Sequence, residues 1–535
     1  MERSISAKMR RTIVPNESTI RPRRAPLGEA PLRIELDRGE GAPPIFEQVR
    51  ASVRRAVAAG TLPAGVRLPP ERDLAAALGV SRSTVMRAYQ ELVADGLVEA
   101  APSRGTVVAP VRQVADRVGG AAAGSWVAAL PPFAAPGTDA GLLRDVFSAR
   151  GTDDMISFAS SAPPEDLIPV TDLLACAREA FEEVGPKLLG YGPVDGSSAL
   201  REVIADRMRA VGSMARGDAV IVLSGSTQGL ALASRVLIER GDEVAVEAPT
   251  YVGAIQTFET SGARLVGVPA DGQGMRTETL AEILSRRRIR LILVQPNFQN
   301  PTGAILSQQR REHLLWLARR HGVPILEDDA YGALYHHPPA PDSLKRADRH
   351  GQVIYLSSFS KTLAPGLRIA WMCGPEPVIA RIALAKQFSD LNTNSLGQAI
   401  VSRMLSGGRY DVHLERLRTA SRERMVLLLR RLDEMSDVLE RDLDPRGGLH
   451  VWCRLRSGDA RYAVASAIRS GVALLAGPAF YPAGSLGAAG ADRIRISLPT
   501  SGRDAIDAGA RRLREALQEL PLRCEPASSD HAVVV

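Results

Sequence analysis

The chain of 535 residues has 67 Lys and Arg against 60 Asp and Glu, a formal net charge of +7, and 45% hydrophobic residues. This length exceeds one ordinary domain, and the composition is that of a folded chain, which excludes a wholly disordered protein. No apolar stretch is long enough to span a membrane or to act as an export signal, so we expect a cytoplasmic protein.

Two amphipathic helices are predicted after a basic N-terminal arm. Residues 1–41 contain RR at 10–11 and RPRR at 21–24 among Pro, Ser and Thr, and we interpret them as a flexible arm. In IFEQVRASVRRAVAA, residues 45–59, apolar residues recur four apart, which predicts an amphipathic helix. PERDLAAAL then predicts a short helix that Gly79 ends.

The next stretch, VSRSTVMRAYQELVADGLV, predicts a further helix that Ser81 caps. Val85, Ala88, Tyr89 and Leu92 follow at core spacing. Two short helices joined by a turn form a helix-turn-helix, and LVEAAPSRGTVVAP predicts a two-stranded wing after it.

Together, residues 43–110 resemble the GntR-type winged helix, which implies binding to double-stranded DNA. The second helix of such a motif enters the major groove with its N-terminus first, and the wing lies near the minor groove. Met86 stands where some members of the family have a third arginine, and Arg87 is the candidate replacement. The predicted DNA-binding residues are Arg72, Arg82, Ser83, Thr84, Arg87, Arg104 and Gly105. Each arginine taken singly is equally well explained as a solvated surface residue.

Residues 111–150 are rich in Gly, Ala and Pro and are interpreted as an interdomain linker. Beyond them, short apolar runs such as AVIVLSG, DEVAVEAPTY, IRLILVQPN and QVIYLSSFS alternate with helical stretches. This alternation predicts an α/β domain around a mainly parallel sheet. The cysteines Cys176, Cys373, Cys453 and Cys524 lie far apart without zinc-type spacing, so we expect reduced thiols and no metal site.

A group of chemically matched residues surrounds Lys361 in SSFSKTLAPGLR. An ε-amine forms a Schiff base with an aldehyde, and a phosphorylated aldehyde also needs hydroxyl groups and a guanidinium. SGSTQGL at 224–230 follows a strand and opens a helix, which suits a phosphate. EDDAY at 327–331 ends another strand. Taken alone, Lys361 would be interpreted as a surface lysine, SGSTQGL as a simple capped helix and EDDAY as an ordinary acid pair at a strand end.

In this order, the motifs over residues 151–520 resemble the fold-type-I pyridoxal-phosphate enzymes of the aspartate-aminotransferase superfamily, with a large domain and a smaller α+β C-terminal subdomain. The resemblance implies a Schiff base at Lys361, a partner for the pyridine nitrogen at Asp328 and a carboxylate-binding Arg495. The other implied cofactor residues are Tyr191, Gly225, Ser226, Thr227, Tyr251, Asn300, Tyr331, Ser358, Ser360 and Arg368. Tyr191 would reach the phosphate of the other subunit, which implies a homodimer.

A GntR-type winged helix joined by a linker to such a domain resembles the MocR subfamily of bacterial transcription regulators, with residues 521–535 as a tail. The resemblance implies a regulator that binds pyridoxal 5'-phosphate and senses a small amino compound, the cofactor itself, or both. The alternative is a working aminotransferase with an attached DNA-binding domain.

Overall fold

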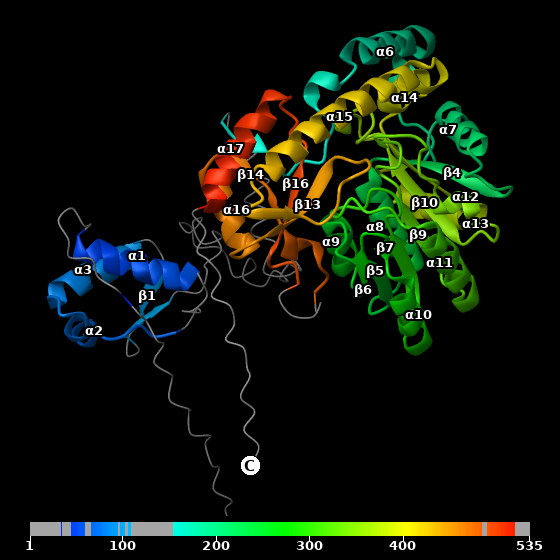
Figure 1. Ribbon diagram of the computed structural model, residues 1–535. Helices are drawn as coiled ribbons and strands as arrows, with labels where there is room; N and C mark the ends of the chain where they lie inside the picture. The colour runs from blue at the N-terminus through cyan, green and yellow to red at the C-terminus, as the bar shows by residue number, and fades with distance from the viewer. Residues whose placement is uncertain are drawn as a thin grey trace, which may run out of the picture. The chain divides into compact units, whose positions relative to one another are not determined.

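The computed structural model describes residue 34 and residues 44–58, 66–94, 97–101, 105–108, 154–483 and 489–518. The chain divides into two compact units, Met1–Gly120 and Ala121–Val535, and each is described by itself (Figure 1). Apart from residue 34, the predicted arm, linker and tail lie outside the described residues. Cys524 lies outside them too, whereas the other three cysteines are buried free thiols.

In its described residues, the first unit contains three helices and a hairpin: α1 (Ile45–Ala58), α2 (Glu71–Leu78), α3 (Arg82–Ala94), β1 (Val98–Ala101) and β2 (Gly105–Val108). The strands pair antiparallel, so the predicted helices and wing are confirmed. The core includes Val49, Val85, Leu92 and Val98, which bring the helices and the wing together.

The turn between α2 and α3 is built from two local features. Gly79 has φ 61, and its N–H donates to carbonyls of the last turn of α2, as a C-capping glycine does. Ser81 accepts from the backbone N–H of Thr84 at 3.2 Å, which confirms it as the cap of α3. The exposed N-terminal end of α3 is therefore held at a defined angle to α2.

The second unit contains an eight-stranded sheet in the order β4-β11-β10-β9-β8-β5-β6-β7. Its strands are β4 (Asp218–Leu223), β5 (Glu243–Ala248), β6 (Arg264–Asp271), β7 (Gly274–Met275), β8 (Ile289–Val294), β9 (Ile325–Asp328), β10 (Val353–Ser358) and β11 (Ala370–Pro375). The five strands from β10 to β6 are parallel, which confirms the predicted mainly parallel sheet. The carboxyl ends of β5, β8, β9 and β10 therefore open at one edge.

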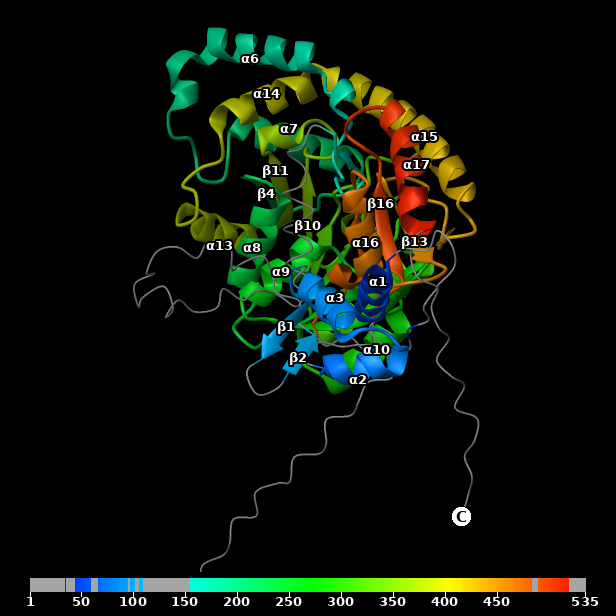
Figure 2. The same cartoon turned by 90° about the vertical axis from the view of Figure 1, so that its left-hand side faces the viewer.

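Helices cover both faces of this sheet (Figure 1; Figure 2). Ile221 and Leu223 of β4 pack with the side of α8, α9 and α13, whereas Val220 and Val222 face the core that α7 and α14 share. On that second face α10, α11 and α12 cover the other strands. The bounds are α7 (Ser198–Ala210), α8 (Ser226–Leu237), α9 (Val252–Thr260), α10 (Thr277–Arg286), α11 (Gln308–His321), α12 (Leu344–Ala347), α13 (Glu376–Gln387) and α14 (Ser395–Ser406).

A smaller subdomain follows the long helix α15 (Arg409–Asp433), as predicted. It contains a four-stranded antiparallel sheet in the order β12-β13-β16-β15. The first strand of the unit, β3 (Ile156–Ser157), pairs with β14 in this subdomain. The remaining bounds are α6 (Val170–Val184), β12 (Leu439–Arg441), β13 (His450–Leu455), α16 (Ala460–Arg469), β14 (Val472–Ala473), β15 (Leu475–Ala476), β16 (Arg493–Ser497) and α17 (Asp504–Gln518).

Within the described ranges, no helix is both long and apolar enough to cross a membrane. The same part of the chain contains no cluster of His, Cys, Asp or Glu that is suited to a metal ion.

Candidate functional site

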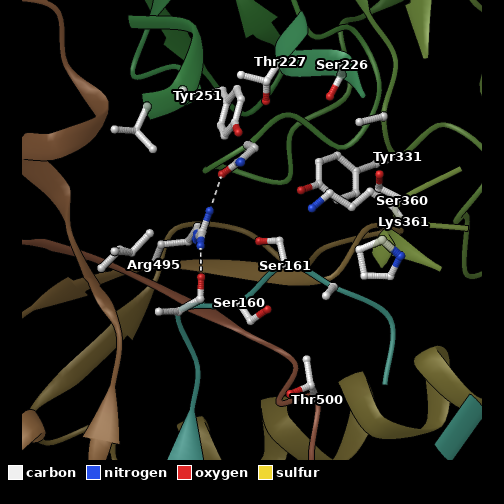
Figure 3. A pocket seen from close by; sticks show the side chains of 18 of the residues that line it. Ser160, Ser161, Ser226, Thr227, Tyr251, Tyr331, Ser360, Lys361, Arg495 and Thr500 are labelled. Carbon is white, nitrogen blue, oxygen red and sulfur yellow. Dashed lines mark hydrogen bonds between the residues drawn. The ribbon is translucent and has the colours of Figure 1, made fainter. Parts of the chain in front are cut away.

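A cavity of about 710 Å³ lies at the carboxyl ends of the parallel strands, between the large sheet and the smaller subdomain. Side chains from both parts converge on it (Figure 3). The predicted residues that line it are Ser226, Thr227, Tyr251, Asn300, Asp328, Tyr331, Ser360, Lys361, Arg368 and Arg495. Residues up to 269 positions apart are therefore brought together, and the sequence motifs describe one site.

The N-terminus of α8 forms one wall of the cavity. Gly225 precedes the helix with φ 119, and a Cβ atom there would lie 2.3 Å from Nη2 of Arg368. Glycine is thus needed for the guanidinium to lie beside the helix end, where Ser226 and Thr227 add hydroxyl groups. Backbone N–H groups, hydroxyls and a guanidinium together suit a phosphate.

A buried interaction fixes the start of this helix. Asp390 accepts from the hydroxyl of Ser224 at 2.8 Å, from Nε2 of Gln228 at 2.7 Å and from Nζ of Lys386 at 2.8 Å. Partial burial alone would raise the pKa of this carboxyl group, but the hydrogen bonds from Lys386, Gln228 and Ser224 outweigh it and leave the pKa lowered. The carboxylate of Asp390 therefore ties α8 to the segment after α13. No sequence pattern indicated this link, because Ser224 and Gln228 lie more than 150 positions from Asp390.

Asp328 ends β9 and lines the cavity together with the cationic residues Lys361, Arg368 and Arg495. Its Oδ2 accepts from Nε2 of Gln295 at 2.7 Å, and its Oδ1 has no hydrogen-bond partner among the described residues. Burial raises the pKa of Asp328 to about 6, while the hydrogen bond from Gln295 lowers it. An unpaired oxygen of a buried carboxyl group is a place for a ligand N–H.

A second acid, Glu247 at the end of β5, lies behind this one. It is fully buried, and its Oε2 accepts from the backbone N–H of Gln295 at 2.9 Å. Burial raises the pKa of Glu247 to about 8, so it is largely protonated at neutral pH. Gln295 therefore links the two acids. The sequence interpretation passed over Gln295 and Glu247, although QPNFQN and VEAPTY contain them at the ends of strands.

Arg495 of β16 is buried on the opposite side of the cavity. Its Nη1 donates to Oδ1 of Asn300 at 2.9 Å, and its Nη2 donates to the carbonyl of Ala159 at 2.5 Å (Figure 3). Ser160, Ser161 and Thr500 lie next to it on the cavity wall. A guanidinium among hydroxyl groups suits a carboxylate, and these hydroxyl residues were not predicted.

Lys361 lies on the wall after β10. Its Nζ is 6.0 Å from the ring centroid of Tyr331, which is buried. Burial raises the pKa of the Tyr331 phenol, so this group stays protonated at neutral pH. The amine, the phenol and the carboxyl of Asp328 thus share one cavity with Tyr251 and Asn300.

Three predicted cofactor residues are not among those that line the cavity: Gly225, which precedes α8, Ser358 and Tyr191. Ser358 is buried behind Ser360: its hydroxyl donates to Oγ of Ser360 at 2.9 Å and accepts from the backbone N–H of Ser360 at 3.0 Å. The hydroxyl of Ser358 thus supports Ser360, which lines the cavity, and the contact of Ser358 with the phosphate stays a prediction. Tyr191 is 87% exposed and does not line its own chain's cavity.

The predicted DNA-binding residues gather around the start of α3. Arg72, Arg82 and Ser83 are exposed, and Arg82 pairs with Glu71 across a distance of 3.1 Å. The hydroxyls of Ser83 and Thr84 lie 2.8 Å and 2.7 Å from that of Ser81. Gly105 begins β2, whereas Arg104 lies outside the described residues.

Arg87 is exposed and, like Arg82, has its guanidinium engaged within the domain. Its Cζ lies 3.8 Å from the ring centroid of Phe46, and its Nε lies 3.5 Å from Oε1 of Glu91. That Arg87 replaces the arginine missing at Met86 stays a prediction.

Two family descriptions match the chain. Residues 45–108 match the bacterial regulatory proteins of the gntR family, and residues 153–520 match aminotransferase class I and II. The solved structure of LysN, the α-aminoadipate aminotransferase of Thermus thermophilus complexed with N-(5'-phosphopyridoxyl)-L-leucine, is 33% identical with a TM-score of 0.66, and the match covers 74% of this chain and 98% of that one. The kynurenine aminotransferase of Pyrococcus horikoshii, solved in complex with PMP, is 33% identical with a TM-score of 0.67, and the match covers 71% of this chain and 94% of that one. The fold and the cavity thus define an aminotransferase-like protein of fold type I with a DNA-binding domain.

Among curated proteins, the probable rhizopine catabolism regulatory protein MocR of Rhizobium meliloti is 33% identical over 77% of this chain and 82% of its own length. The HTH-type transcriptional regulator YdfD of Bacillus subtilis is 30% identical over 77% and 84%. The 2-aminoadipate transaminase of Thermus thermophilus is 34% identical over 71% of this chain and 94% of its own length. The chain belongs to the MocR-type transcriptional regulators, in which a GntR winged helix is joined to an aminotransferase class I and II domain.

Proposed function

We propose that this regulator binds pyridoxal 5'-phosphate in the large cavity and senses a small amino compound there, with operator binding as its output. The observation that carries the proposal is the convergence of Lys361, Asp328 and Arg368 on a single cavity. An amine, a buried acid and an anion site are the three elements that a phosphorylated pyridine aldehyde requires.

The residues fit this cofactor. Oδ1 of Asp328, which has no hydrogen-bond partner among the described residues, suits the pyridine N–H. The helix end beyond Gly225, with Ser226, Thr227, Ser360 and Arg368, suits the phosphate. The aromatic ring of Tyr251 is on the same wall and would lie against the pyridine, while Asn300 and Tyr331 suit the ring hydroxyl.

Bound pyridoxal phosphate would supply an aldehyde that condenses with amines and a pyridinium that withdraws electrons. The chain's own residues do the rest. Asp328, ionised next to a cation, would hold the proton on the pyridine nitrogen. Lys361 would offer the amine that competes with the effector, and Arg495 would orient a carboxylate of the effector.

We further propose that the functional unit is a homodimer. Tyr191 is 87% exposed, and Leu189 and Phe388 are 73% and 79% exposed. Large apolar groups at such exposure favour a protein partner. In a dimer, Tyr191 would be available to the partner's phosphate site, and two winged helices would bind paired half-sites with increased effective concentration.

The test combines chemistry and DNA binding. The wild-type protein is incubated with pyridoxal phosphate, reduced with borohydride and digested, and we expect one cofactor-bearing peptide containing Lys361. Lys361→Ala should lose this adduct and keep its circular dichroism spectrum and dimer, and exposed Lys187→Ala should retain the adduct. An adduct that survives in Lys361→Ala overturns the assignment.

DNA upstream of the protein's own gene is then titrated at fixed salt with and without cofactor and a panel of amines. Affinity that changes only when an amine is added supports amine sensing, whereas a change with cofactor alone supports sensing of the cofactor itself. Failure of every fragment to compete better than random DNA contradicts the regulator's proposed output.

A working aminotransferase is the second candidate, favoured by the 34% identity to a transaminase and by the shared cavity of Lys361 and Arg495. Steady release of a keto acid in the presence of an added amino acceptor distinguishes turnover from sensing alone. Absence of release across the panel of amino donors would remove this candidate.

A further inference from the structure

A second cavity, of about 440 Å³, lies on the other side of two segments that form the cofactor cavity. In residues 328–331, Asp328 and Tyr331 line the first cavity, whereas Asp329 lines the second. In residues 358–362, Ser360 and Lys361 line the first cavity, and their neighbours Ser358, Phe359 and Thr362 line the second. The two cavities therefore share Ala330 and are separated by the backbone of these two segments.

A row of aromatic rings forms one side of this second cavity. The ring centroids of Tyr355 and Trp371 are 6.5 Å apart, those of Trp371 and Phe359 are 4.6 Å apart, and those of Phe359 and Tyr410 are 5.7 Å apart. All four residues line the cavity together with aliphatic residues of α7 and α14. Volume and lining match those of small-molecule sites, which are mostly apolar with few polar groups.

Three arginines line the wall near this row, and each is paired with an acid: Arg207 with Asp411, Arg346 with Asp342 and Arg418 with Glu415. The guanidinium carbon of Arg207 lies 5.3 Å from the ring centroid of Tyr410, at the end of the row. Arg207 also pairs with Asp411, which does not line the cavity, and its side chain is 40% exposed. Arg346 and Arg418 are the other cationic residues on the wall.

Asp329, the buried acid of this cavity, has its carboxyl group hydrogen-bonded within the protein and does not indicate a cation site. Asp329 accepts from the hydroxyl of Tyr355 at 2.9 Å, from Nδ2 of Asn297 at 3.2 Å and from the backbone N–H of Gly332 at 3.0 Å. Its oxygens are thus already hydrogen-bonded, and burial favours the neutral form. The remaining charge on the wall comes from arginines, apart from Asp342, which pairs with Arg346.

We propose that this cavity is a second ligand site, for a planar aromatic carboxylate whose ring lies on the row and whose carboxylate pairs with Arg207. The site is independent of the cofactor cavity in its chemistry, since Arg495 and Lys361 take no part. Because Ala330 lines both cavities and segments 328–331 and 358–362 separate them, occupancy of one changes the packing of the wall of the other.

The probe is naphthalene-2-carboxylate, titrated by calorimetry into the full chain saturated with pyridoxal phosphate and, in parallel, into the chain without it. We expect one saturable site per chain in both titrations. Arg207→Gln, on an exposed side chain, should weaken binding about tenfold. The uncharged naphthalene-2-carboxamide should show a similar loss with the wild type.

Two further variants locate the site. Ala333→Phe places a ring in the second cavity and should abolish binding, whereas Arg495→Gln should leave it unchanged. The proposal is overturned if no saturable binding occurs, if the carboxamide binds as well as the acid, or if Arg207→Gln and Ala333→Phe both bind normally. Binding that disappears when pyridoxal phosphate saturates the chain, or in Arg495→Gln, would place the acid in the cofactor cavity and also overturn it.

Discussion

Nη1 of Arg495 and Oδ1 of Asn300 form a buried hydrogen bond of 2.9 Å that connects the smaller subdomain to the loop after β8. The guanidinium is thereby oriented before any ligand arrives, and its second nitrogen is held by the carbonyl of Ala159. Preorganised donors of this kind lose little entropy when they bind a carboxylate.

The first prediction concerns this guanidinium. Arg495→Gln should weaken binding of carboxylate-bearing amines to the cofactor-loaded protein by about 1.5–3 kcal/mol, because a charged hydrogen bond is lost. Amines without a carboxylate should bind equally to both proteins. Spectral titration with amino acids and with their decarboxylated amines measures the difference. Arg493→Gln, two residues away on the same strand, is the control, and an equal loss there would point to damage of β16.

The second prediction concerns Gly225. In Gly225→Ala, the new Cβ would lie 2.3 Å from Nη2 of Arg368, and φ 119 is unfavourable for alanine. The guanidinium must move, so affinity for pyridoxal phosphate should fall about tenfold or more. Gly366→Ala is the matched control, since its Cβ meets nothing within 4 Å. Cofactor affinity is measured by absorbance titration. If Gly225→Ala binds pyridoxal phosphate as tightly as the wild type, the assignment of Arg368 to the phosphate is contradicted.

The third prediction concerns the buried Glu247, whose pKa lies at about 8 in the folded chain against an ordinary value of 4.5. Between these values the folded chain binds more protons than the unfolded chain, so this group lowers stability as pH rises. The side chain of Glu247→Gln cannot ionise. The difference between its free energy of unfolding and that of the wild type should therefore increase in favour of the variant from pH 5 to pH 8. Denaturant titrations of the cofactor-free proteins measure the difference. Glu243→Gln, on the same strand, should show no such trend, and a pH-independent difference for Glu247→Gln would contradict the assigned protonation.

The fourth prediction concerns Arg82 at the start of α3. Its partner Glu71 holds the guanidinium in the DNA-free protein, with 3.1 Å between Nη2 and Oε2. Arg82→Ala should weaken binding to DNA from upstream of the gene by about 1–3 kcal/mol if Arg82 contacts a base, with a smaller loss on random DNA. Glu71→Gln should strengthen binding to both. Affinities are measured in a gel-shift assay at fixed salt, with Arg235→Ala, an exposed position in the second unit, as the control. Unchanged affinity in Arg82→Ala would contradict the assignment of Arg82 as a base-contacting residue.

The elements with strong local patterns could be predicted from the sequence. Ser81 and Gly79 mark helix ends by their own hydrogen bonds, and the strand motifs locate Asp328, Lys361 and Ser226 at one sheet edge. What escaped prediction depends on contacts between distant segments. Asp390 reaches Ser224, 166 positions earlier, only in the fold. Glu247 carries no pattern that separates it from an exposed acid.

The pairing of β3 with β14 fixes the start of the second unit's described residues on the smaller subdomain. β3 is the first strand after the region that joins the two units, and two residues beyond it the carbonyl of Ala159 accepts from Arg495. A carboxylate that binds Arg495 competes for the donor that tethers this segment. β3 and the residues after it are thus held on the smaller subdomain by both backbone and side-chain hydrogen bonds.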